Sequence, residues 1–113
     1  MIGERTGKAI EIAVKAEKKH CIEVHGEFHN HHEAWAVLRE EVQEVHECFF
    51  PFDSKTDNAI DCLWDFVRYD AAGEEAEELI DQIYEVAEEL AKECIQVMAV
   101  CQKWLRLIEK ERE

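Results

Sequence analysis

The sequence has little that would interrupt a helix. Proline occurs once, at Pro51, and glycine occurs four times in 113 residues. No segment alternates apolar and polar residues between turn signals, as a half-buried strand does. These absences exclude a fold built on a sheet and predict an all-α protein, with residues 1–113 forming a single domain.

Long apolar runs are also missing. No run approaches the ~20 residues that a membrane span requires, and the first ten residues, MIGERTGKAI, lack the apolar centre of a signal peptide. The five cysteines include no C-x-x-C pair. We therefore expect reduced, mostly buried thiols in a cytoplasmic protein that binds no membrane.

Positive charge is scarce. Thirteen lysines and arginines face 27 aspartates and glutamates, which gives a formal net charge of −14. So negative a surface repels nucleic acid backbones and anionic membranes, and excludes both as expected partners. It also repels nucleotides and phosphate esters, unless metal cations first neutralise some of the carboxylates.

Apolar periodicity and turn residues predict four helices. The first runs from after Thr6 to Val24 and is ended by Gly26. In the second, Asn30 is the N-cap, with Glu33 reaching back to it in a capping box, and Pro51 forbids continuation. The third and fourth helices are predicted at residues 57–70 and Glu74–Lys110.

The last predicted helix has more apolar surface than its shorter partners cover. One row alternates steps of three and four residues, as in coiled coils: Leu79, Ile83, Val86, Leu90, Cys94, Val97, Cys101, Trp104 and Ile108. A second row widens the face: Ile80, Tyr84, Ala87, Ala91, Met98 and Leu105. The expected architecture is therefore a four-helix bundle that forms a homodimer or homotetramer.

Two glutamates have unusual helical phases. On the second helix the apolar stripe (Trp35, Leu38, Val42, Val45, Phe49) centres near Leu38 and Val42, and Glu41 lies only about 60° from Leu38. On the last helix Glu93 lies only about 60° from Leu90. A solvated glutamate is expected on the opposite side of each helix.

Two interpretations of these glutamates remain open on the residues alone. Each side chain can extend past the edge of the core into water, or pair with a neighbouring lysine or arginine. Alternatively, Glu41 and Glu93 face one another, joined by Glu44 one helical step beyond Glu41. Crowded carboxylates cannot all stay ionised without a cation, and their hard oxygen atoms suit Mg²⁺ or Mn²⁺.

The segments HEAWAVLREEVQEV and EELAKECIQVMAVCQKWL resemble the paired helices of the MazG-like all-α nucleoside triphosphate pyrophosphohydrolases. The similarity covers residues 29–50 and 88–105. More specifically, the two segments resemble a phage and bacterial branch of the family, in which the corresponding helices read roughly HEAYAVLLEEVEE and EAIQVAAMA. The resemblance implies an oligomeric helical bundle that hydrolyses a nucleoside triphosphate to the monophosphate and pyrophosphate with Mg²⁺.

The resemblance also implies particular metal ligands. Its E-x-x-E pair falls on Glu41 and Glu44, with Glu40 directly before them. The second pair begins at Glu93, but its fourth position is Gln96 where the family has aspartate, which removes one anionic ligand. Glu41, Glu44 and Glu93 are then the expected catalytic groups.

A competing register for the second pair exists in EELID, at Glu78 and Asp81. These residues lie about 120° and 180° from Leu90 and face away from the predicted core, so we prefer Glu93 and Gln96. A different class of function also remains open. The chain could be a non-catalytic oligomerisation or partner-binding protein that keeps the scaffold with an incomplete metal site.

Other residues offer weaker signals for ligand binding. Trp35, two turns before Glu41, and Lys92 are candidates for contacting a nucleotide. Four scarce positive charges are candidates for meeting phosphates, although a solvated side chain is the preferred interpretation of any one of them: Arg39, Arg68, Lys92 and Lys103. A zinc site built from Cys21 and the nearby histidines (His25, His29, His31, His32) matches no standard ligand spacing, and a solvated loop is the simpler interpretation.

Overall fold

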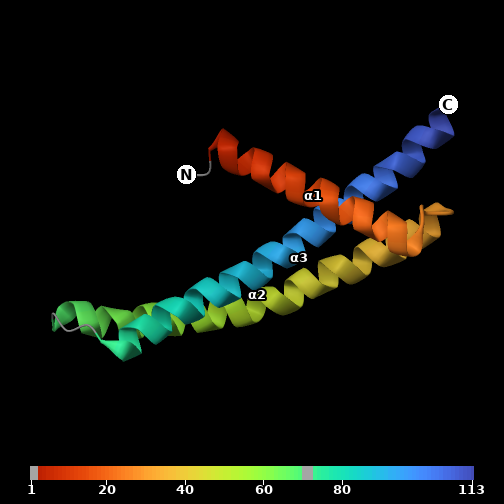
Figure 1. Ribbon diagram of the computed structural model, residues 1–113. Helices are drawn as coiled ribbons and strands as arrows, with labels where there is room; N and C mark the ends of the chain where they lie inside the picture. The colour runs from red at the N-terminus through yellow and green to blue at the C-terminus, as the bar shows by residue number, and fades with distance from the viewer. Residues whose placement is uncertain (1–2, 70–72) are drawn as a thin grey trace. The chain divides into compact units, whose positions relative to one another are not determined.

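The structure is a computed structural model that describes residues 3–69 and 73–113. These residues form three helices, α1 (Glu4–His25), α2 (His31–Arg68) and α3 (Glu74–Arg112) (Figure 1). The all-α prediction is confirmed, and the prediction of four helices is wrong. Within the described ranges, no helix has the length and apolar character needed to cross a membrane.

The predicted stop at Pro51 is wrong, because α2 continues through it. Proline in a helix interior removes one backbone hydrogen bond and costs about 3 kcal/mol. A continuous row of buried or half-buried side chains crosses this point, comprising Cys48, Phe52, Thr56 and Ala59, and their burial offsets that cost. The helix predicted at 57–70 is thus the second half of α2, and its predicted end at residue 70 lies outside the described residues.

The chain divides into two compact units. The first unit comprises Met1–Glu44 and Glu93–Glu113, and the second comprises Val45–Lys92. The first unit therefore contains α1, the beginning of α2 and the end of α3. The second unit contains the remainder of α2 and α3.

The second unit is an antiparallel helix pair (Figure 1). Its buried and half-buried rows advance by three and four residues, as coiled-coil seams do: Phe52, Thr56, Ala59, Leu63 and Phe66 on α2, and Ala76, Leu79, Ile83, Val86 and Leu90 on α3. The sequence pattern places Ile60, Leu63, Trp64 and Val67 together on the buried face of a helix at 57–70. This is only partly correct, since Ile60, Trp64 and Val67 are 59%, 57% and 67% exposed. Because α2 is continuous, the face that it buries after residue 57 is set by the row of side chains that begins at Phe52.

The first unit has a small core formed by Phe28, Ala34 and Val100. Partly buried side chains pack around it: Val37, Leu38, Trp104 and Leu107. Trp35, placed by the sequence pattern on the apolar stripe, is exposed. The side chains that α2 buries in this unit therefore do not follow the predicted stripe. They lie on the neighbouring face of the helix, which contains Glu41.

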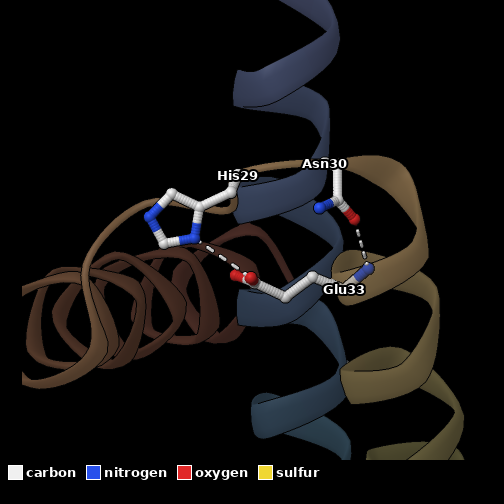
Figure 2. A network of polar contacts seen from close by, with 3 residues as sticks. All are labelled: His29, Asn30 and Glu33. Atoms are coloured by element: carbon white, nitrogen blue, oxygen red, sulfur yellow. Dashed lines mark hydrogen bonds and ion pairs between the residues drawn. The ribbon is translucent and has the colours of Figure 1, made fainter.

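Two local interactions determine the turn between α1 and α2. Gly26 ends α1 as predicted, with a φ of 77° that favours glycine, and its N–H donates to the Ile22 carbonyl. Asn30 caps α2, because its Oδ1 accepts from the Glu33 backbone N–H at 2.9 Å (Figure 2). The reciprocal half of the predicted capping box is absent here: the Glu33 carboxylate contacts His29 Nδ1 at 3.1 Å.

Polar contacts tie this turn to the end of α3. Glu27 pairs with Arg106 at 2.7 Å and with Lys110 at 3.1 Å. His31 accepts a hydrogen bond from Trp104 Nε1 at 2.9 Å and contacts Glu111 at 2.8 Å. These contacts fix the start of α2 against α3, and so set the register that places Glu41 relative to Glu93.

Candidate metal centre and adjoining pocket

Three glutamates converge within the first unit. Glu41 and Glu44 lie on α2 and Glu93 on α3, and one carboxylate oxygen from each lies within 4.8 Å of the other two. The helical phases of Glu41 and Glu93 had left this arrangement open as one of two interpretations. In residues 3–69 and 73–113, this is the single group of three or more histidine, cysteine or acidic side chains placed to share an ion. We call it the glutamate triad.

Two members of the glutamate triad are withdrawn from water. Glu41 and Glu93 are half-buried and Glu44 is exposed. The Oε2 atoms of Glu41 and Glu93 are both shielded from solvent, and that of Glu41 has no hydrogen-bond partner among the described residues. A buried, unsatisfied carboxylate oxygen is costly. The geometry differs from that of a side chain that extends past the core edge into water.

The surroundings of Glu41 favour its protonated form. Burial, followed by the negative charge of Glu44 and a hydrogen bond with it, raises the pKa of Glu41 from 4.5 to about 7. The charges of Glu93 and Glu40 add to the effect. Near neutral pH the triad therefore either holds a proton or requires a positive charge in its place.

The donor set fits a hard divalent cation. All three groups offer carboxylate oxygens, the ligands that Mg²⁺ and Mn²⁺ prefer, and Mg²⁺ sites commonly keep water or substrate in the remaining positions. Gln96 is half-buried and Glu40 exposed, and both line the pocket beside Glu41. The competing pair, Glu78 and Asp81, is exposed, as its helical phase predicted.

A pocket of about 510 Å³ opens beside Glu41. Its walls come from α1, the turn before α2, and the first-unit parts of α2 and α3. The volume lies in the range of small-molecule sites, ~300–1,000 Å³. Glu41 and Gln96 line one part of the wall, and Phe28 and Lys103 line another.

Lys103 is the one of the four positive charges considered for phosphates that lines this pocket. It was expected to be solvated, but it is 5% exposed, and its ammonium lies 4.1 Å from the centre of the Phe28 ring. A signal was available in the spacing. Lys103 follows Gln96 by seven residues, which places the two within about 20° on the same face of α3.

The two predicted nucleotide contacts lie elsewhere. Trp35 is 53% exposed, and the Arg39 guanidinium stacks over its ring at 5.4 Å. Lys92 is exposed and pairs with Glu88 at 3.4 Å and Glu89 at 3.6 Å on its own helix. Neither Trp35 nor Lys92 is among the residues that line the pocket.

The residues considered for zinc make other contacts. Cys21 Sγ donates to Glu17 at 3.7 Å, and burial, followed by the negative charge of Glu17, raises the pKa of the Cys21 thiol. His29 contacts Glu33. The hydrogen bond from His29 in turn lowers the pKa of Glu33. All five cysteines are free thiols.

No family model, curated protein or solved structure matches this chain. The resemblance of two segments to the MazG-like pyrophosphohydrolases stays a prediction, and the geometry of the glutamate triad and pocket is a separate observation.

Proposed function

We propose that this protein is a Mg²⁺-dependent nucleoside triphosphate pyrophosphohydrolase, releasing a nucleoside monophosphate and pyrophosphate. The observation that carries the proposal is the convergence of Glu41, Glu44 and Glu93 beside a pocket of about 510 Å³. A pocket in the size range of small-molecule sites and three convergent carboxylates beside it both support a reaction of this kind. Mn²⁺ suits the same oxygen ligands.

Each residue has a role in this proposal. Glu41, Glu44 and Glu93 would hold the cation, and the Gln96 amide oxygen would offer a neutral ligand where the resembled family has aspartate. Glu40, directly before the pair, adds negative charge to the same part of the pocket. When bound, the cation supplies charge neutralisation for the phosphates and polarises the water that attacks them.

The reaction breaks the anhydride between the α and β phosphates. The oxygen of a water molecule forms a new bond to phosphorus, and the bond from that phosphorus to the bridging oxygen breaks. Pyrophosphate and the monophosphate separate. Any carboxylate of the triad that does not ligate the cation would accept a proton from the water.

The second candidate is a non-catalytic oligomerisation or partner-binding protein. The observation that favours it is the exposed apolar surface of the second unit, where Trp64 and Val67 are 57% and 67% exposed. This surface suits association, but it offers no account of why two carboxyl groups of the glutamate triad are drawn out of water.

The decisive test is a panel of nucleoside triphosphates with Mg²⁺ or Mn²⁺, in which released pyrophosphate is distinguished from orthophosphate. We expect pyrophosphate from the native protein. Glu41→Gln and Glu93→Gln should each lose this activity and the rise in melting temperature that Mg²⁺ produces by binding the folded state. Helix content and oligomeric mass should be unchanged, because the substitution is nearly isosteric.

Glu78→Gln is the matched control, since Glu78 is an exposed glutamate of the same helix as Glu93. It should behave as the native protein does. Loss of activity in Glu78→Gln with activity kept in Glu93→Gln would show that the Glu78 and Asp81 register is the correct one. If neither Glu41→Gln nor Glu93→Gln alters the response to Mg²⁺, the scaffold function is the correct one.

A further inference from the structure

Lys103 is a buried cation that the roles assigned to the glutamate triad do not use. Its side chain is 5% exposed and lines the pocket beside Glu41. Lysine is almost never buried to this extent unless its charge is paired. The position therefore requires an explanation in terms of what compensates the ammonium group.

The contact with Phe28 compensates it only in part. The ammonium lies 4.1 Å from the ring centre, and a cation–π contact at a desolvated site is worth roughly 2 kcal/mol. Removing an ammonium group from water costs several kcal/mol. Among the described residues, the Phe28 ring is the direct partner identified for the Lys103 ammonium.

Two of the four carboxylates that line the pocket contact other partners. Glu17 accepts the hydrogen bond of the Cys21 thiol, and Glu33 contacts His29 (Figure 2). Their charges act on Lys103 through space but place no oxygen within ion-pair distance of it. The ammonium thus remains available to a group that enters the pocket.

The position of Lys103 along α3 points to the same conclusion. Lys103 lies seven residues after Gln96, or about 10 Å further along α3, on the same helix face. The Cα–Cβ bonds of a helix tilt toward its N-terminus, and Gln96 and Glu93 lie on that side of Lys103 along α3. A cation site and a single buried positive charge then border one pocket.

We infer that Lys103 is the anion-binding group of this pocket and contacts the phosphate chain of the substrate, whose other phosphates lie at the glutamate triad. The identity of the anion as a nucleoside triphosphate rests on the proposed function. The existence of an anion subsite at Lys103 does not. Lys103 is thereby a substrate-binding residue in a chain whose negative surface otherwise repels phosphates.

The test is calorimetric titration of the full chain with inorganic tripolyphosphate, in one arm with Mg²⁺ at fixed concentration and in another with a chelator. Lys103→Met keeps the length and apolar stem of the side chain and removes its charge. Loss of a charged hydrogen bond in the pocket should weaken tripolyphosphate binding by roughly tenfold or more. Binding of Mg²⁺ alone should stay unchanged, and Lys103→Arg should keep most of the anion affinity.

A second readout separates binding from packing. Without ligand, Lys103→Met should melt at a higher temperature than the native chain, because it removes a poorly compensated buried charge. Stabilisation by tripolyphosphate should nevertheless fall. Lys103→Gln gives the same comparison should the methionine variant not fold.

The outcomes distinguish this inference from the proposed function. Equal tripolyphosphate affinity in Lys103→Met and the native chain overturns the inference and leaves Lys103 a structural contact of Phe28. Failure of the native chain to bind tripolyphosphate in either arm overturns it as well. Lys103-dependent binding in a chain that hydrolyses no nucleoside triphosphate upholds the anion subsite and defeats the proposed function.

Discussion

Replacing Glu41 by glutamine should stabilise the metal-free protein, and by an amount that depends on pH. The pKa of Glu41 is raised from 4.5 to about 7, first by burial and then by Glu44. A carboxyl group with a raised pKa in the folded state binds its proton more tightly there than in the unfolded chain. Stability is therefore greatest below pH 4.5, falls as the pH rises toward 7, and stays low above it.

The magnitude follows from that shift. A change of this size corresponds to ~3.4 kcal/mol of differential interaction if none of it is screened. Because Glu41 is half-buried, water screens part of it, and we expect about 1–2 kcal/mol. Glu41→Gln removes the charge at every pH, so the variant should exceed the native chain by this amount at pH 8.5 and by only about a quarter of it at pH 5.

The assay is thermal unfolding in the presence of a chelator, from pH 5 to pH 9. For a domain of this size the expected difference at pH 8.5 is a rise in Tm of roughly 5–10 °C. Glu78→Gln, at an exposed position, should stay within ~0.5 kcal/mol of the native chain throughout. Two results would refute the crowding of charge at the triad. One is a Glu41→Gln variant that is less stable than the native chain at pH 8.5, and the other is a rise in Tm at pH 5 as large as the rise at pH 8.5.

Two further predictions concern the scaffold. Asn30→Ala should lower the free energy of unfolding by about 1 kcal/mol, because it removes the cap on α2. Asn30→Asp keeps a capping oxygen and should not lower it. Denaturant titration measures both variants, and an equal loss of stability in the two would contradict the capping role. The chain should also associate, because no large side chain is fully buried among the described residues while Phe50 is 72% exposed. Light scattering at micromolar concentration should give at least twice 13.2 kDa, and a mass near 13.2 kDa would exclude the dimer and tetramer.

Local sequence signals determined the helical content and two of the helix ends. Gly26 ends α1 and Asn30 caps α2 because each acts on backbone atoms within four residues, so its effect can be inferred without knowing the rest of the fold. Helical phase likewise indicated that Glu41 and Glu93 lie nearer the buried side than Glu78 does. Phase depends only on spacing along one helix.

Tertiary packing decided the features that depend on a partner helix. Pro51 disfavours a helix locally, yet a row of side chains from Cys48 to Ala59 is buried continuously across it, and burial outweighs one missing hydrogen bond. The same packing left Ile60 and Trp64 exposed, since the phase of a continuous α2 differs from that of a separate helix beginning near residue 57.

The burial of Lys103 also required the tertiary structure. Its spacing from Gln96 places it on the inner face of α3, but lysine on such a face ordinarily extends to water. Only the fold brings Phe28, from the turn before α2, over its ammonium group. The sequence by itself determined which residues share a helix face, and the packing of α1, α2 and α3 in the first unit decided which of those faces water reaches.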